Sequence, residues 1–559
     1  LFYIAITILF ALRQPPQLRG YVDGTLTFGN PLFAFAIQAF LARDFEYGMA
    51  WSSGAAGVLY LLLAWLLFMH GRQSLRLLAG AFLALGVIFL SLTIPFALDG
   101  EWITTAWALE GGAMLWIGVR QQRRRTIAFA LLLQLLAGAG YLLEAGGRGE
   151  SIAVLNALCL SSVLVSAAGL FSGYYLYRHF QGARRWEAAC ATPMLFWGLL
   201  WWFGNGWHEI DAYVPARYNL TAVILLAALS CAVLGSLERR LDWKTLRHTP
   251  TGLLAALTLL TFTTLIAKPH FFAYYGYLAW SIAAAAYYRL LYQRDRLGGM
   301  AGQFLNLLHA LGLWLIVGIT TYEAHWSIEH WLQLAGAWHY IVIGLIPALA
   351  LSLAVGLSCW PFKRHREAYI GLAGYTLAAF LLLWTLSVNL GTDGNPWPLP
   401  YLPLLNALDI AQLLVFGALL QWWRHPHARQ SWRRHDPFFY SLTAAAAFLW
   451  ANAVLIRSLH YWFELPLDAD AIFDSTLAQA CLSVFWTLIG LGVMLLATRR
   501  GLRQVWIAAA ALLGMTVAKL FLLDLADSET LESIISFIVV GVLLLLVGYF
   551  SPLPPRIRS

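Results

Sequence analysis

The chain has 559 residues, of which 60% are hydrophobic and only 11% are charged, whereas soluble globular proteins carry about 25% charged residues. Its mean hydropathy is +0.68 and its formal net charge is +8. This composition excludes an ordinary soluble enzyme. It also disfavours nucleic-acid binding, because the Lys and Arg residues stand in short clusters between apolar runs, which is the pattern that sets orientation in a membrane.

Long apolar runs occupy most of the chain. They approach the 17 to 25 residues or so that a helix needs to cross a bilayer, and the short alternating segments typical of a membrane β-barrel are absent from the sequence. We therefore predict an all-α fold, a polytopic transmembrane helical bundle. The predicted membrane segments are 1–12, 31–42, 51–69, 77–98, 102–119, 126–143, 152–177, 187–203, 219–236, 252–267, 271–292, 303–320, 338–359, 369–388, 401–422, 438–456, 475–497, 504–522 and 531–549.

Two of these segments are unusual. The first begins at Leu1, inside an apolar run and without Met, so we interpret the chain as a fragment whose N-terminal part is missing. Segment 31–42 is too short to span a bilayer alone. It is either re-entrant or begins earlier, near Thr27.

The charges agree with this segmentation. Strict alternation of the segments places most of the 36 basic residues in loops on one side, and the positive-inside rule makes that side cytoplasmic. The opposite loops carry most of the acidic residues. We therefore predict a multi-pass protein of the bacterial inner membrane with a cytoplasmic C-terminus.

The sequence also shows signs of internal repetition within a single integral membrane domain, 1–559. The basic clusters recur about every sixty residues, as expected for an array of helical hairpins. The tetrapeptide at 155–158, Leu-Asn-Ala-Leu, recurs at 405–408, and the segment 107–120 has the outline of 486–499. Small residues four apart, Gly169 with Gly173 and Gly80 with Ala84, predict close helix approach.

Several stretches resemble a known family. They are Asn-Pro-Leu-Phe-Ala-Phe-Ala at 30–36, Ile-Pro-Phe-Ala-Leu-Asp-Gly-Glu-Trp at 94–102, Ala-Trp-Ala-Leu-Glu-Gly at 106–111 and Ala-Lys-Leu-Phe-Leu-Leu-Asp-Leu at 518–525. The chain resembles the predicted bacterial membrane proteins called domain of unknown function 2339. The resemblance implies a polytopic membrane protein, whose relatives typically carry an upstream charged, coiled-coil segment. It implies no activity and no catalytic residue.

Ionisable residues inside the predicted spans are the first candidates for a site, because each costs about 2.5 to 3.5 kcal/mol on insertion scales. Glu110 and Asp409 each lie about eight residues, or roughly 12 Å, from the outer end of the predicted helix. Arg457 and Lys519 lie near outer helix ends and are candidate counter-charges. The four either line a polar cavity or form structural ion pairs and hydrogen bonds within the bundle.

The outer loops supply a second set of candidates. Histidine beside carboxylates can act as a general base or bind a metal, but none of the spacings is a recognised metal motif, and solvated loop residues explain the set equally well. If the chain is duplicated, the two histidines of this set occupy related places after segments 187–203 and 438–456. The candidates are Asp99, Glu101, His208, Glu209, His460 and Asp524.

Four other histidines, His309, His325, His330 and His339, are interpreted as hydrogen-bonded packing residues. The five cysteines show no CxxC spacing and no readable disulfide framework or zinc site. No phosphate-binding loop, dinucleotide fingerprint or haem-binding pair is evident. We therefore expect no cofactor and no metal.

Three functions stay open. The first is a transporter or flippase-like protein for a solute or a lipid-linked envelope precursor, built from repeats with discontinuous helices; Gly111 and Gly112 mark the best candidate break. The second is a membrane-embedded glycosyl or acyl transferase with Asp99, Glu101 or Glu110 as base or metal ligand. The lack of a large outer loop counts against it.

The third function is a structural membrane scaffold that holds envelope proteins through an upstream region. Transport ranks first and an enzyme is the less favoured alternative. The expected partners are membrane lipids, a lipid-linked glycan or small solute, and envelope proteins, without nucleic acid.

Overall fold

The computed structural model is mainly helical in the residues it describes, which are 29–42, 47–69, 76–97, 100–144, 152–180, 186–430 and 436–519 with a few isolated positions. No strand is present in these ranges. Ten helices of this part of the chain are long and apolar enough to cross a membrane. The chain is therefore an all-α polytopic membrane protein.

The helices form two compact units. Unit 1 comprises residues 1–260 and 273–297, and unit 2 comprises 261–272 and 298–559. Helix α12 (Thr249–Ala267) contributes to both. The other helices of unit 1 are α3 (Asn30–Leu41), α4 (Gly48–Met69), α5 (Arg76–Ala97), α6 (Gly100–Arg120), α7 (Arg124–Glu144), α8 (Ala157–His179), α9 (Trp186–Ala189), α10 (Ala191–Tyr213), α11 (Asn219–Leu241), η3 (Lys244–His248), η4 (Ala273–Tyr275) and α13 (Gly276–Leu297).

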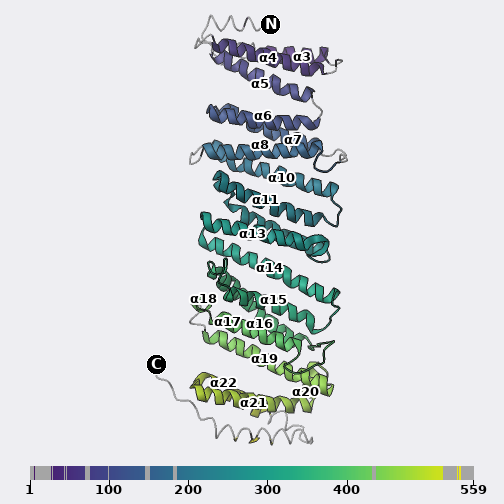
Figure 1. Ribbon diagram of the computed structural model, residues 1–559, viewed down its shortest axis with the longest axis vertical. Helices are drawn as coiled ribbons and strands as arrows, with labels where there is room; N and C mark the ends of the chain where they lie inside the picture. Colours follow the sequence, from purple (N-terminus) through teal and green to yellow (C-terminus); the bar gives the residue numbers. More distant parts are fainter. Residues whose placement is uncertain are drawn as a thin grey trace. The chain divides into compact units, whose positions relative to one another are not determined.

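Unit 1 is built from neighbouring helices that pack side by side (Figure 1). Helix α4 packs on α5, α6 on α7, and α8 on both α6 and α10. A Cβ at Gly169 would lie 3.0 Å from the Cα of Gly198, and one at Gly173 would lie 2.8 Å from the backbone nitrogen of Leu195. The predicted close approach at this pair is confirmed, whereas no atom lies within 4 Å of the Cβ position at Gly80.

In unit 2, too, neighbouring helices pack side by side. Helix α15 packs on α14 and α17, α16 packs on α19, and α21 packs on α22. A short π-helical turn leads into α16. The elements are α14 (Gly302–His330), α15 (Ala337–Gly356), η5 (Glu367–Leu372), α16 (Ala373–Gly391), α17 (Ala407–Arg424), α18 (Pro426–Gln430), α19 (Asp436–Phe463), α20 (Ala469–Asp474), α21 (Thr476–Arg500) and α22 (Arg503–Lys519).

Every predicted segment from 31–42 to 504–522 corresponds to a helix, whereas segments 1–12 and 531–549 lie outside the described ranges. Several predicted ends were wrong. Helix α10 continues ten residues past 203, α14 ten past 320 and α19 seven past 456. The reason is that a helical backbone needs no apolar side chains to propagate once it is formed, so hydropathy locates the span but not the helix end.

The predicted break at Gly111 and Gly112 was also wrong, because α6 is helical from Gly100 to Arg120. A Cβ at Gly111 would lie 2.7 Å from Cγ of Gln134 and 3.0 Å from the carbonyl oxygen of Ala130. The glycine therefore serves helix packing against α7 rather than a break. Gly490 occupies the matching place in the echoed segment 486–499, where its Cβ would lie 2.8 Å from Leu513 of α22.

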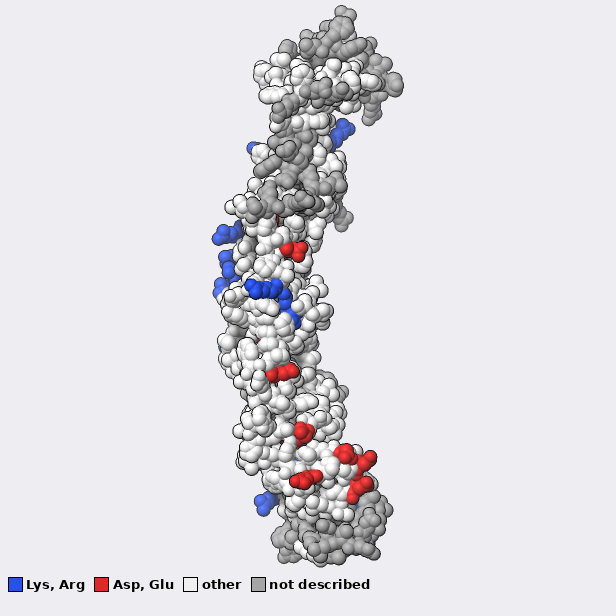
Figure 2. Space-filling model, turned by 90° about the vertical axis from the view of Figure 1, so that its right-hand side faces the viewer, with Lys and Arg blue, Asp and Glu red and all other residues white. Residues whose placement is uncertain are grey.

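Many of the exposed charged side chains stand in loops and at helix ends. Figure 2 shows the side on which α20 lies in Figure 1, and acidic side chains stand on the part of that face which belongs to unit 2. Glu464, Asp468, Asp470 and Asp474, at or beside α20, are all exposed. Asp468 also caps α20 by accepting from the backbone nitrogen of Ala471 at 2.7 Å.

Candidate functional site

The start of α17 carries a buried carboxylate. Asn406 caps this helix, and its side-chain oxygen accepts from the backbone nitrogen of Asp409 at 2.9 Å. In return, Oδ2 of Asp409 accepts from the Asn406 amide and from the backbone nitrogen of Leu404. The pattern differs from a capping box, because Asp409 returns the bond to the side chain of Asn406 and to Leu404 and not to the Asn406 backbone nitrogen. The prediction that Asp409 lies about eight residues inside its helix was wrong, because the prolines at 398, 400 and 403 delay the helix start to Ala407.

Arg457 of α19 faces this carboxylate. Its Nη1 lies 3.7 Å from Oδ1 of Asp409, and the same oxygen accepts from Nε1 of Trp450 at 3.2 Å. Asp409 is 0% exposed and Arg457 is 2% exposed. Taking both charges out of water is costly unless they remain paired and hydrogen bonded, so the contacts around them hold the pair together.

The guanidinium is fixed from the opposite side by α16 and the loop that follows it. Arg457 donates to the carbonyl oxygen of Val388 at 2.9 Å and to that of Thr392 at 3.4 Å. Gly394 has φ +72°, and a Cβ there would lie 2.9 Å from Cδ of Arg457. Only glycine satisfies both the left-handed backbone and the close approach of this side chain.

Two amide side chains form a further polar contact between α16 and α17. Gln412, three residues after Asp409 on α17, is 0% exposed. It exchanges hydrogen bonds with Asn389 of α16, one at 2.7 Å and one at 3.2 Å. Each amide thus provides the other with a donor and an acceptor. The polar network consists of Asn389, Asn406, Asp409, Gln412, Trp450 and Arg457, and it joins α16, α17 and α19.

An apolar groove of about 610 Å³ runs along the same three helices. We call it the α16–α19 groove. It begins near Tyr375 and Phe438 and reaches Leu386 and Leu449. Trp450, the next residue of α19, already belongs to the polar network. The groove is lined by Tyr375, Ala378, Ala379, Leu382, Leu383, Leu386, Trp422, Trp423, Phe438, Phe439, Leu442, Ala445, Ala446 and Leu449.

The other two candidates within the predicted spans have different partners. Glu110 of α6 is half-buried and accepts from the Ser91 hydroxyl of α5 in unit 1. Lys519 of α22 donates to the carbonyl oxygen of Gln479 at 2.9 Å and to the Ser483 hydroxyl at 2.7 Å, both on α21. The structure therefore pairs Asp409 with Arg457, whereas the cavity shared by all four residues stays a prediction.

In unit 1, Glu209 also joins a helix cap. Asn156 accepts from the backbone nitrogen of Cys159 at 2.6 Å and so caps α8. Its amide donates to Oε1 of Glu209 at 2.8 Å, and the backbone nitrogen of Val154 donates to Oε2 at 2.8 Å. Glu209 is therefore a connector between α10 and the start of α8.

The two histidines expected after helices 187–203 and 438–456 lie inside longer helices, His208 in α10 and His460 in α19. Nδ1 of His460 is 2.7 Å from the carbonyl oxygen of Leu465, a contact that closes the end of α19. Asp99 and Asp524 lie outside the described residues. Glu101 lies in α6, and its side chain is outside the described part.

Comparison with known proteins decides the family. The family model described as "Predicted membrane protein (DUF2339)" matches residues 1–554. The chain belongs to this DUF2339 family. No curated protein and no solved structure gives a significant match. The resemblance found in the sequence is thus confirmed, and membership establishes a predicted membrane protein of unknown function.

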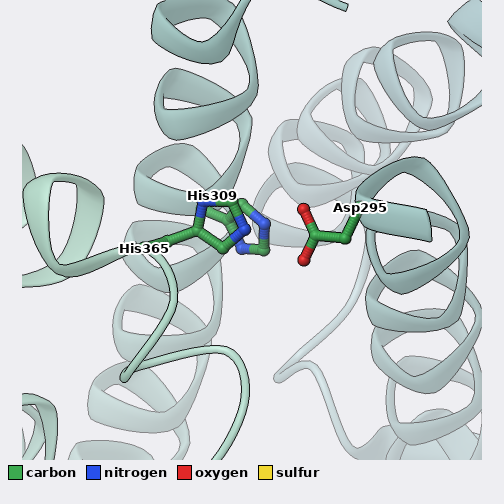
Figure 3. Close-up of side chains that lie close together, drawn as sticks. All are labelled: Asp295, His309 and His365. Atoms are coloured by element: carbon green, nitrogen blue, oxygen red, sulfur yellow. The ribbon is translucent and has the colours of Figure 1, made fainter. Parts of the chain in front are cut away.

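Among the described residues of this DUF2339 protein, two groups of histidines and carboxylates lie close enough together to hold a metal. Of their histidines, the sequence interpretation took His309, His325 and His339 as packing residues and did not single out His365. His309 and His365 of unit 2 stack with ring centroids 4.0 Å apart, as Figure 3 shows. Nδ1 of His309 lies 3.0 Å from the Tyr369 hydroxyl, and Nδ1 of His365 lies 3.0 Å from Oδ1 of Asn306. These contacts make the pair a hydrogen-bonded part of the unit 2 core. Asp295, also labelled in Figure 3, belongs to unit 1.

A second group in unit 2 has a different character. Ligand atoms of His325, Glu329 and His339 all lie within 4.8 Å of one another. The one feature of the sequence that could have indicated this group is the interval of four residues between His325 and Glu329, because it places both side chains on one helical face. His339 comes from the next helix, and no spacing rule relates it to the other two.

Proposed function

We propose that this DUF2339 protein is a flippase-like transporter of a lipid-linked, anionic envelope precursor. The observation that supports the proposal is that the α16–α19 groove and the buried Asp409–Arg457 pair are built on the same three helices, α16, α17 and α19. An apolar groove and a charged pair on the same helices match the two parts of such a lipid, its hydrocarbon chain and its phosphate. A volume of about 610 Å³ also falls in the usual range of ligand pockets, about 300 to 1,000 Å³.

Arg457 is the group that recognises the anionic head group. Guanidinium binds phosphate through several donors in a fixed plane, and Nη1 of Arg457 has no hydrogen-bond partner among the described residues. Asp409 balances its charge when the site is empty, since an unpaired buried charge is strongly destabilising. Exchange of the Asp409 carboxylate for the phosphate then couples lipid binding to a rearrangement of α17 against α19.

The protein acts in the bacterial inner membrane under this proposal. The loops rich in Lys and Arg face the cytoplasm by the positive-inside rule, together with the C-terminus. The polar network then lies toward the periplasmic end of its helices, because α17 begins on the side opposite the basic segment 424–434. The Tyr375 and Phe438 end of the groove lies toward the cytoplasm.

Native mass spectrometry of the protein, extracted under mild conditions, tests lipid binding. Ala445→Phe fills the α16–α19 groove, and Ala444→Phe adds the same ring to the neighbouring exposed position outside it. We expect a co-purifying anionic lipid in the unmodified protein and in Ala444→Phe, and its loss in Ala445→Phe. Equal lipid retention in the two variants would contradict the groove as the binding site.

Translocation requires a separate measurement. Reconstituted protein should move a fluorescent anionic lipid between the leaflets of a liposome, and Asp409→Asn should slow this movement. Asparagine keeps the shape of the side chain but removes the charge that exchanges with phosphate, and its single oxygen keeps only part of the hydrogen bonds that Oδ1 and Oδ2 accept. Binding without translocation would favour the transferase alternative, and absence of both would favour the scaffold; either result overturns the transporter proposal.

Cys359 offers a test of the orientation. It is the one exposed cysteine of the five, and it precedes the basic residues Lys363, Arg364 and Arg366. In a variant whose other cysteines are replaced by serine, an impermeant maleimide should label Cys359 only after the membrane is permeabilised. Asp470→Cys in the same background is the matched control on the opposite side, and we expect its labelling in intact spheroplasts. Labelling of Cys359 in intact spheroplasts, with Asp470→Cys labelled only after permeabilisation, would show the opposite orientation in the membrane.

A further inference from the structure

The C-terminal end of α14 brings three potential metal ligands together with the start of α15. His325 and Glu329 lie one helical turn apart on α14, and His339 lies in the first turn of α15. The imidazole rings of His325 and His339 are 4.9 Å apart between centroids and inclined by 62°. Their ligand atoms and a carboxylate oxygen of Glu329 lie within 4.8 Å of one another.

Both imidazoles carry an unsatisfied nitrogen. Nδ1 of His325 and Nδ1 of His339 are buried and have no hydrogen-bond partner among the residues that the structure describes. A buried polar atom without a partner costs about 1 to 3 kcal/mol, and such atoms require an explanation such as a bound ion. The histidine packing predicted from the sequence does not provide one here, because packing histidines are normally hydrogen bonded.

The position of His339 is fixed by the loop that follows α16. The backbone nitrogen of Ala337 donates to the carbonyl oxygen of Asn395 at 3.0 Å, and Nε1 of Trp338 donates to that of Trp397 at 2.8 Å. Gly336 has φ +68°, and a Cβ there would lie 2.8 Å from the Asn395 oxygen. The beginning of α15 is thereby held in place, which is the preorganisation a ligand set needs.

The chemistry of the three groups selects the ion. Two imidazoles and one carboxylate suit zinc and related divalent transition metals, whereas Mg²⁺ and Ca²⁺ prefer a shell of oxygen ligands. A tetrahedral zinc site holds its ligand atoms about 3.4 Å apart, so small side-chain rotations from the present separations complete the site. Three protein ligands leave a fourth position open. His325 also lines an apolar cavity of about 590 Å³ with Thr321 and Tyr322.

We propose that His325, Glu329 and His339 form a binding site for a zinc-class divalent metal ion at the junction of α14 and α15. The site is independent of the transport proposal, since it uses neither the polar network nor the α16–α19 groove. The ion joins the end of one membrane helix to the start of the next and therefore stabilises this hairpin when bound.

The test uses the full 559-residue chain, purified in detergent with a tag that contains no histidine and freed of metal with EDTA. Zn²⁺ is then titrated in competition with a chromogenic chelator. We expect one Zn²⁺ per chain, a roughly 100-fold or greater loss of affinity in His325→Ala and His339→Ala, and a loss of about tenfold in Glu329→Gln. His179→Ala, at the exposed end of α8, is the control and should bind Zn²⁺ normally.

A second measurement separates loss of ligands from loss of folding. X-ray absorption of the zinc-loaded protein should show only nitrogen and oxygen ligands at about 2.0 to 2.2 Å, including at least two imidazoles. Zn²⁺ should also raise the Tm of the unmodified chain but not that of His325→Ala. The proposal is overturned if the unmodified chain takes up no zinc, if both histidine variants bind as tightly as it does, or if the spectrum shows no imidazole.

Discussion

Helices α8 and α17 start within the same four-residue sequence, Leu-Asn-Ala-Leu, yet the two starts lie in different electrostatic surroundings. Asn156 and Asn406 both cap their helices through the same backbone bond, and both donate their side-chain amide to a carboxylate. In unit 1 that carboxylate is Glu209 of α10, which is partly exposed. In unit 2 it is Asp409 of the capped helix itself, fully buried beside Arg457.

The difference shows which property belongs to the motif and which to its neighbours. The cap depends on residues three apart in sequence and forms in both places. Burial and charge pairing depend on helices that are distant in sequence, α10 in one case and α19 in the other. The same tetrapeptide therefore starts a connector in unit 1 and the polar network in unit 2.

The largest expected effect is the loss of stability when the buried ion pair of unit 2 is broken, compared with the loss of the partly exposed carboxylate in unit 1. Arg457→Leu leaves the Asp409 carboxylate buried without its counter-charge, and this should lower the free energy of unfolding by about 3 to 5 kcal/mol. Glu209→Gln in unit 1 removes one partly exposed charge and should cost about 1 kcal/mol. Unfolding of both variants in mixed micelles measures the difference. Arg457→Leu combined with Asp409→Asn should recover part of the loss; equal costs for the two single variants would contradict the comparison.

Gly394→Ala is expected to have the next largest effect. It forces a left-handed backbone on alanine and pushes a methyl group against Arg457, so it should cost about 1 to 3 kcal/mol. Gly417→Ala, at a helical glycine with no atom within 4 Å of its Cβ position, is the matched control in α17. It should leave stability unchanged or raise it slightly. The same unfolding assay measures both variants. An unchanged free energy of unfolding in Gly394→Ala would show that the loop does not hold the Arg457 guanidinium.

The two caps provide a finer comparison. Asn156→Ala and Asn406→Ala each lose a helix cap, which is worth about 1 kcal/mol. Asn406→Ala should cost roughly 1 kcal/mol more, because it also removes a donor from the buried Asp409 carboxylate. Asn156→Asp and Asn406→Asp sharpen the test, since aspartate keeps the cap but places a second negative charge next to the carboxylate. Asn406→Asp should be the more destabilising of the two.

The smallest effect is expected at Glu110. Glu110→Gln keeps an oxygen that accepts from Ser91, so stability should change by less than about 1 kcal/mol. If Glu110 serves only to join α5 and α6, lipid translocation by reconstituted protein should be unaffected as well. A large loss of translocation with normal stability would instead give unit 1 a charged site that matches the Asp409 site of unit 2.

The sequence predicted the helices more successfully than their ends. Apolar runs located the helices of both units because lipid and packing both demand apolar faces. The starts at Ala157 and Ala407 were missed, although the asparagine before each is a recognisable cap. Among the site residues, the sequence singled out Asp409 and Arg457 because charges inside spans are rare, but it grouped them with Glu110 and Lys519, which bond to other helices.

Composition and pattern by themselves determined that this is a polytopic helical membrane protein, because hydropathy and helix capping act over a few neighbouring residues. Similarity along residues 1–554 placed it in the DUF2339 family. Only the tertiary structure decided that Asp409 faces Arg457, that the α16–α19 groove lies on the helices that carry this pair, and that His339 lies beside His325 and Glu329. These contacts join residues 48 and 14 positions apart in the chain. Such distances are closed by helix packing, which no local sequence signal encodes.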